Sequence, residues 1–128
     1  MNIHYLNTDL ELESASDLKP IVEAFGEDVV VLHQGIVRGN HRASFEIAGS
    51  HAGPDENIKY FVALVDALSL EARALWNGCY SRVFDIGYSS GSGTSSYRSE
   101  LRANTIQALA ALNATIVVTV YPLTTDDT

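Results

Sequence analysis

Hydrophobic positions along the chain follow two spacings, which divide it into strands and helices. Residues 3–13 alternate, with Leu6, Leu10 and Leu12 pointing one way and mainly polar or acidic side chains pointing the other. A period of two residues predicts a strand with one buried and one solvated face. Residues 18–25 instead carry apolar side chains at i, i+3, i+4 and i+7, which predicts an amphipathic helix.

Two apolar runs, 29–37 and 41–48, flank the dipeptide Gly39-Asn40 and predict a β-hairpin with a two-residue turn. The position of the turn sets which residues of the two strands pair. On this register His33 lies opposite Glu46 as a cross-strand charged pair. The core side of the first run then holds Val30, Leu32 and Ile36.

The second half of the chain predicts three helical segments and two strands. Apolar stripes at helical spacing occupy 58–68 and 72–79, and a strand pattern covers 82–88. A loop rich in glycine and serine leads to a helix pattern over 99–112. The final run, 115–121, is almost wholly apolar, which is typical of a strand that is central or buried on both faces.

The predicted elements follow the order β-α-β-β-α(α)-β-α-β, which indicates an α+β fold. The first part matches the ferredoxin-like β-α-β-β-α-β pattern, a mainly antiparallel sheet with helices on one face, and a C-terminal α-β unit extends it. A chain of 128 residues suits one domain. We expect that domain to span 1–123, followed by a disordered polar tail over 124–128.

Composition favours a cytoplasmic protein. No apolar run approaches the ~20 residues that a membrane span needs, so we expect no membrane association. The N-terminus lacks the basic head and apolar core of a signal peptide. The single Cys79 has no partner for an internal disulfide, which suits a reducing compartment.

Acidic residues are concentrated near the N-terminus of a chain whose formal net charge is −8. Residues 1–28 hold seven acids against one base, Lys19. This balance argues against nucleic acid as a partner, because phosphate binding needs clusters of lysine and arginine. It suits a basic protein partner, although a net charge away from zero also serves solubility alone.

Three of these carboxylates share one face of the first predicted strand, roughly 7 Å apart because every second residue faces the same way. They are Asp9, Glu11 and Glu13. The functional interpretation is a docking face for a basic partner. The alternative is a solvated face that discourages pairing with other sheet edges.

The glycine-rich segment 87–98 is the main candidate for ligand binding. Backbone N–H groups around Gly91 and Gly93 can converge on an anion, and Arg98 and Arg102 would add positive charge. The segment contains neither the P-loop motif nor the full dinucleotide-binding pattern. The alternative interpretation is a flexible connection.

Asp85 is a second candidate, because a carboxylate between Phe84 and Ile86 must be solvated, paired or functional. The arginines nearest to it in the predicted fold are Arg82, Arg98 and Arg102. A small-molecule site built from the loop and this strand would contain Trp76, Asp85, Tyr88, Gly91, Gly93, Arg98 and Arg102.

No segment carries a catalytic or metal-binding signature. The four histidines, His4, His33, His41 and His51, share no i, i+4 helical spacing, and Cys79 has no CxxC partner. Neither Gly49-Ser50 nor Gly91-Ser92-Gly93 has the frame of a Gly-x-Ser-x-Gly nucleophile motif. We therefore expect no catalytic residues, no metal and no cofactor, and Cys79 fits a buried structural position on an apolar stripe.

Several motifs in the C-terminal half resemble those of small bacterial proteins classed as domains of unknown function. These motifs are 84–88, 100–102, 109–114 and 118–122. The resemblance covers about 40 residues and implies a bacterial context and a shared fold. It implies no functional residues.

The sequence therefore predicts a non-catalytic protein-interaction module. One concrete form is an acidic, immunity-protein-like neutraliser of a basic toxin or nuclease. Two alternatives stay open: a small-molecule or anion binder that uses the 87–98 loop, and a structural homo-oligomer joined through helices or an edge strand.

Overall fold

The computed structural model describes residues 2–49, 53–93 and 95–123. The predicted tail 124–128 and His51 lie outside these residues. The elements are, in chain order, β1 (His4–Ser14), α1 (Lys19–Phe25), a 3₁₀ turn (Gly26–Asp28), β2 (Val29–Val37), β3 (Asn40–Ile47), α2 (Pro54–Asp66), α3 (Leu70–Asn77), β4 (Ser81–Ser89), α4 (Ala103–Ala111) and β5 (Thr115–Tyr121).

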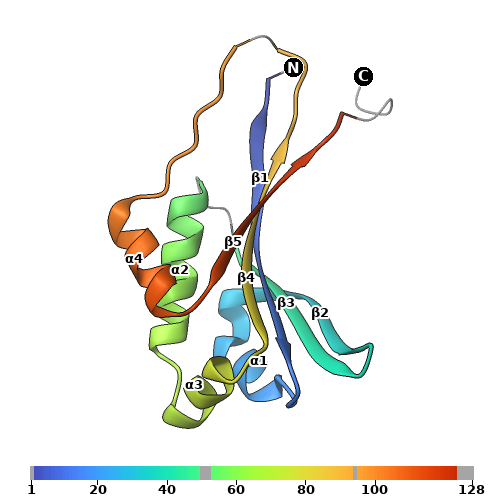
Figure 1. Cartoon of the computed structure of the whole chain (residues 1–128), viewed down its shortest axis with the longest axis vertical. Helices are drawn as coiled ribbons and strands as arrows, with labels where there is room; N and C mark the ends of the chain where they lie inside the picture. Colours follow the sequence, from blue (N-terminus) through green and yellow to red (C-terminus); the bar gives the residue numbers. More distant parts are fainter. Residues whose placement is uncertain (1, 50–52, 94, 124–128) are drawn as a thin grey trace.

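The strands of the described residues form one five-stranded sheet in the order β2-β3-β1-β4-β5. Neighbouring strands run antiparallel except β4 and β5, which are parallel and connected through α4. Figure 1 shows the helices gathered on one side of the sheet. The predicted α+β class and the mainly antiparallel sheet are therefore confirmed.

β1 is the middle strand, and its alternation decides which face of the sheet is buried. From Thr8 to Ser14 the even-numbered side chains are buried and the odd-numbered ones are partly exposed. The prediction fails at Leu6, which is 46% exposed. The pairing of β1 with β4 shifts between Tyr5 and Asn7, and such a bulge moves the preceding side chains to the other face.

The core fills the space between the helices and the even-numbered side of β1. Its largest fully buried side chains are Phe25, Phe45, Phe61, Trp76 and Phe84. Phe25 meets Phe45 edge to face with ring centroids 5.2 Å apart, and Phe61 meets Phe84 at 5.5 Å. These pairs join α1 to β3 and α2 to β4, as the helical stripes predict. No helix of the described chain is long and apolar enough to cross a membrane.

The hairpin of β2 and β3 turns one residue earlier than predicted. Val37 pairs with Asn40, so the turn consists of Arg38 and Gly39. Their φ angles are 54° and 86°. Positive φ at both positions is typical of a type I′ turn, whose twist matches that of the flanking strands.

β2 is an edge strand, and this overturns two predictions about its side chains. The pairing with β3 shifts between Val31 and His33, so His33 lies opposite Ser44 and not opposite Glu46. Its apolar residues are also exposed, because β2 has one neighbouring strand and buries only its first residue, Val29. The exposed fractions are 51% for Val30, 47% for Leu32 and 66% for Ile36.

The C-terminal unit is shorter and more exposed than predicted. α4 begins at Ala103, not at Ser99, and residues 95–102 form no helix or strand before it. In Figure 1 this connection runs from the end of β4 back to α4. Asn113 follows the helix with φ 55°, as expected of a left-handed residue at a helix end.

β5 is an edge strand, not the central strand that its apolar run predicts. Its only sheet neighbour among the described residues is β4. Val118 is 57% exposed and Val120 is 51% exposed. A continuous apolar run indicates a strand without a solvated polar face, but it does not reveal whether another strand covers its outer edge.

Candidate functional site: the open face of the sheet

None of the described helices lies on the face of the sheet opposite the core, and we call this face the open face. The core side holds the even-numbered residues of β1 and the odd-numbered residues of β3. The open face therefore presents the complementary sets, together with the residues of β4 that pair with them. Its polar and charged side chains on β1, β3 and β4 include Asn7, Asp9, Glu11, Glu13, Arg42, Ser44, Glu46 and Asp85.

A row of carboxylates crosses the open face from strand to strand. Asp9 on β1 is paired with Glu46 on β3 and with Asp85 on β4. Directly opposed residues of antiparallel strands have Cβ atoms only about 5 Å apart, and like charges in such pairs repel. Three strands thus bring together three acids that are distant in the sequence.

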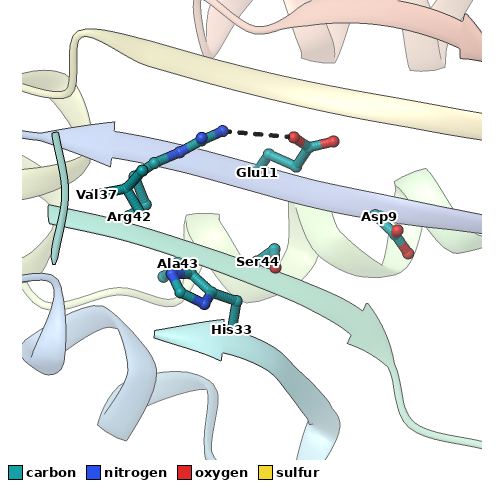
Figure 2. A pocket seen from close by; sticks show the side chains of 7 residues that line it. All are labelled: Asp9, Glu11, His33, Val37, Arg42, Ala43 and Ser44. Atoms are coloured by element: carbon teal, nitrogen blue, oxygen red, sulfur yellow. Dashed lines mark ion pairs between the residues drawn. The ribbon is translucent and has the colours of Figure 1, made fainter. Parts of the chain in front are cut away.

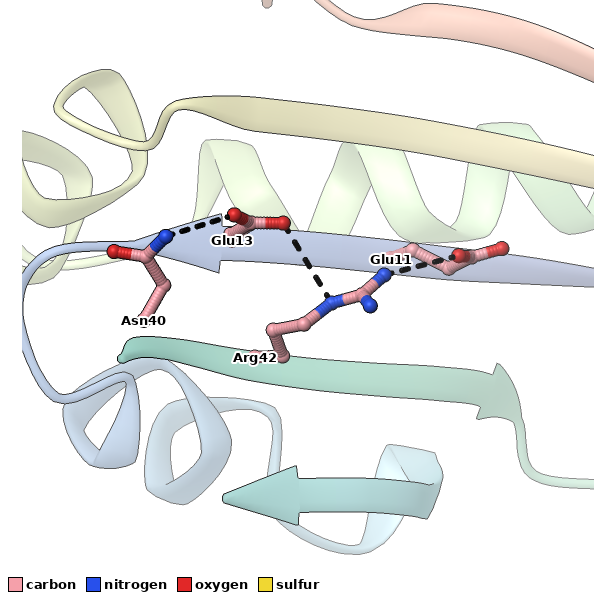
Figure 3. Close-up of polar contacts among 4 residues, drawn as sticks. All are labelled: Glu11, Glu13, Asn40 and Arg42. Atoms are coloured by element: carbon pink, nitrogen blue, oxygen red, sulfur yellow. Dashed lines mark hydrogen bonds and ion pairs between the residues drawn. The ribbon is translucent and has the colours of Figure 1, made fainter. Parts of the chain in front are cut away.

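Arg42 is the one lysine or arginine that the described strands place on this face; the other strand arginine, Arg82, pairs with Leu12 on the core side. Figure 3 shows its guanidinium between two glutamates. Its Nη2 lies 3.9 Å from Glu11 Oε2, and its Nε lies 3.7 Å from Glu13 Oε2. Asn40 Nδ2 also donates to Glu13 Oε1 at 3.1 Å. Arg42 therefore offsets the Glu11–Glu13 end of the face and leaves the row through Asp9 uncompensated.

Asp9 shows the effect of this crowding most clearly. Partial burial, followed by the charges of Glu46, Glu11 and Asp85, raises the pKa of Asp9 to about 6 from 3.8. Its Oδ1 is shielded from solvent and has no hydrogen-bond partner. A carboxylate without donors loses hydration and gains nothing in return, which favours its protonated form.

Glu11 is perturbed in the same direction. Burial raises its pKa, the neighbouring carboxyl of Asp85 raises it further, and Arg42 partly opposes the shift. Asp85 itself accepts a hydrogen bond from the Thr119 hydroxyl at 2.8 Å. The predicted partners Arg82, Arg98 and Arg102 do not pair with it: Arg82 donates to the backbone carbonyls of Trp76 and Cys79.

A groove lined by Asp9 and Glu11 lies over β3, between β1 and the edge strand β2. Its volume is about 320 Å³. Figure 2 shows Asp9 and Glu11 along one side and His33 on the other, with Ser44 between them. The groove is open and shallow, so it suits a side chain of a docked chain more than a small molecule enclosed on all sides.

The partner-binding residues predicted from the sequence all lie on this face. Alternation along β1 was sufficient to place Asp9, Glu11 and Glu13 together. Sequence reasoning missed Glu46 and the link from Asp85 to Asp9, because both depend on strand order and register. The alternation of residues 43–47 already pointed Glu46 away from the core.

The residues proposed for a small-molecule site do not converge. Trp76 is fully buried, and its indole N–H donates to the Leu112 carbonyl at 3.2 Å. Tyr88 is 7% exposed on the core side, where its hydroxyl donates to Ser99 Oγ at 2.6 Å. Asp85 lies on the opposite face of the sheet. The sheet itself separates it from the other two.

The glycine-rich segment does not lead directly into a helix. Gly91 lies against the backbone of Asn2 and Ile3, so closely that a side chain there would collide with β1's leading residues. Gly93 lines a separate groove of about 580 Å³ together with Asn2, Ile3, Ser90 and residues 95–97. Arg98 is exposed outside that groove, and α4 begins only at Ala103. Anion binding by this segment stays a prediction.

Arg102 has a structural contact. Its backbone N–H donates to Asp55 Oδ1 at 2.9 Å, which ties the start of α4 to the first turn of α2. Cys79 is buried, and this burial raises the pKa of its thiol. Across the described ranges, no three histidine, cysteine or acidic side chains are placed to hold a metal ion.

Comparison of the chain with protein-family models, with curated proteins and with solved structures found no significant match. The open face is accordingly the feature on which a functional proposal has to rest. It combines like charges on three strands, a raised carboxylate pKa and an adjoining groove.

Proposed function

We propose that the protein binds a basic segment of another protein through the open face of its sheet. The observation that carries this proposal is the row Glu46–Asp9–Asp85, which runs across three strands and has no lysine or arginine paired with it among the described residues. Repulsion within such a row destabilises the free protein. A partner that supplies lysine or arginine side chains would relieve the repulsion and gain attraction at the same time.

The groove beside Asp9 and Glu11 gives the partner a defined place to bind. It adjoins Asp9, whose Oδ1 lacks a donor, and Glu11, which is only partly balanced by Arg42. A guanidinium or ammonium group in the groove would pair with the exposed parts of these two carboxylates. Arginine suits the site best, because its planar fork reaches two carboxylates together.

Neutralisation of a basic toxin or nuclease, as immunity proteins perform it, is the concrete form of this function that we propose. We also infer that β1 to β4 with α1 and α2 make up a ferredoxin-like core. In support, β3 lies between β1 and β2, and β1 lies between β3 and β4, with antiparallel neighbours. The resemblance to small bacterial proteins stays a prediction.

The test measures binding of a decalysine peptide and a decaglutamate control by isothermal titration calorimetry. We expect decalysine to bind and its affinity to fall as ionic strength rises, because the contacts are between exposed charges. A triple variant, Glu11→Gln with Glu46→Gln and Asp85→Asn, should bind about tenfold more weakly, which corresponds to about 1.4 kcal/mol.

The matched control removes the same charge elsewhere. Glu27→Gln, Glu56→Gln and Glu71→Gln neutralise three exposed acids that lie outside the strands. This variant should keep most of the decalysine affinity. Equal losses in the two triple variants would mean that net charge alone attracts the peptide, and the open face would no longer be the proposed site.

A further inference from the structure

The outer edge of β5 is a second surface that the proposed function does not use. β5 pairs with β4 over seven consecutive residue pairs without a register shift. Alternate N–H and C=O groups of a strand in this position point away from the sheet. Proteins usually protect such an edge with charges, proline, a bulge or a covering segment.

Within the part of the chain that the structure describes, β5 has none of these protections along its length. Residues 115–121 contain no charged residue and no proline, in a chain whose net charge is −8. Exposed apolar side chains extend over both faces of the strand. They are Val117, Val118, Val120 and Tyr121, between 39% and 57% exposed.

The other edge strand, β2, is different. It also exposes apolar residues, but its pairing with β3 shifts between Val31 and His33. A bulge bends the strand and interrupts the regular row of outward hydrogen-bonding groups, which hinders pairing with a further strand. Of the two edge strands of the described sheet, only β5 is therefore free of a bulge.

We propose that β5 pairs antiparallel with β5 of a second copy of this chain, so that one sheet continues across both copies. A second copy fits because the strand is neutral along its whole length. A charged partner strand, whether basic or acidic, would gain no electrostatic attraction from this edge. With the two-fold axis at Val118, the middle residue, all seven residues overlap.

Charge repulsion does not prevent this contact. The nearest acid of the row, Asp85, is one strand away from β5 and is hydrogen-bonded by Thr119. Strands lie about 4.8 Å apart, so the two Asp85 residues would be separated by roughly 14 Å across the joint sheet. That separation exceeds the Debye length of about 8 Å at physiological salt. The pairing also leaves both open faces exposed on the same side.

The test is sedimentation velocity over a range of protein concentrations with Val118→Lys and a matched control, Val30→Lys. Both side chains are about half exposed and both lie on edge strands, at 57% and 51% exposure. Val118→Lys places two lysines opposite each other and should abolish the dimer. Val30→Lys should dimerise like the wild type.

Salt separates this contact from the proposed function. Added salt should strengthen the dimer, because it screens repulsion between two acidic copies, whereas it should weaken decalysine binding. A wild-type protein that stays monomeric at about 1 mM and high salt would overturn the pairing. The pairing would also be overturned if Val30→Lys dissociated the dimer and Val118→Lys left it intact. Circular dichroism of both variants checks that each is folded, and Val120→Lys replaces Val118→Lys if it is not.

Discussion

At the scale of single residues, the repulsion within the acidic row lowers the stability of the folded state most clearly at Asp9. Its pKa of about 6, against 3.8 for an ordinary aspartate, means that the native protein binds a proton more tightly there than the unfolded chain does. The contribution of Asp9 to stability is therefore greatest below pH 3.8 and is lost as pH rises through about 6. A neighbouring acid, Glu13, differs in its contacts, because it has Asn40 and Arg42 as partners.

The substitution Asp9→Asn should therefore stabilise the protein at neutral pH. A pKa difference of this size corresponds to roughly 3 kcal/mol, and we expect about 1 kcal/mol because Asp9 is only half-buried and water screens its charge. Urea denaturation at pH 7 and pH 4 measures the gain, which should shrink at the lower pH, where the wild-type carboxyl is protonated.

The control for this prediction is Glu13→Gln, which removes the same charge from the same strand. Because Glu13 accepts from Asn40 and is paired with Arg42, its neutralisation should leave stability unchanged or slightly lower. Destabilisation by Asp9→Asn at pH 7 would contradict the account of the row as a source of repulsion.

At the scale of elements, the start of α4 depends on a side chain from another helix. The cap position, Arg102, has no hydrogen bond from its own side chain to the helix, but its N–H donates to Asp55 Oδ1. Burial alone would raise the pKa of Asp55; the Arg102 N–H, Thr105 and Lys59 outweigh it and hold that pKa below its usual value. The Asp55 carboxylate thus helps to connect α2 to the C-terminal unit.

We expect Asp55→Ala to destabilise α4 and β5 by about 1 kcal/mol, as the loss of a helix cap does. Glu56→Ala is the control, because both acids lie in the first turn of α2. Hydrogen exchange of the amides in 103–121 measures the effect. Since the pKa of Asp55 is lowered in the folded state, its contribution should persist at neutral pH and disappear as pH falls through that lowered pKa. Equal exchange in both variants would contradict the capping role.

The sequence predicted some elements correctly and others not, because each pattern carries information about burial but not about strand pairing. Alternation in β1 and β3 reported a buried face and a wet face, and the structure has both. The apolar run of β5 reported only the absence of charge, so it could not distinguish a central strand from an unprotected edge. The bulge in β2 is set by pairing with β3, and neither strand alone contains that information.

The candidate site was predictable only in part for the same reason. Asp9, Glu11 and Glu13 share a strand, so local periodicity united them. Glu46 and Asp85 join them through register across three strands, which is a property of the folded sheet. The residues predicted for a small-molecule site do not converge. Asp85 and Tyr88 are three residues apart on β4, so their side chains point to opposite faces of the sheet.

At the scale of the whole molecule, the question is whether the acidic surface serves binding or solubility alone. The two explanations differ in what neutralisation of the open face should do. If its carboxylates are held against their mutual repulsion for a partner, removing them should stabilise the free protein and weaken binding together. If they serve only solubility, their removal should have the same consequences as removal of any other three acids.

The variant with Glu11→Gln, Glu46→Gln and Asp85→Asn should therefore have a higher melting temperature than the wild type and a lower affinity for decalysine. A domain of this size gains roughly 4 °C for each kcal/mol. Salt should raise the melting temperature of the wild type by screening the row and should raise that of the variant less. Differential scanning calorimetry at two ionic strengths measures both effects, with Glu27→Gln, Glu56→Gln and Glu71→Gln as the control. A lower melting temperature in the open-face variant would show that these acids hold the sheet together, and their exposure to a partner would lose its physical basis.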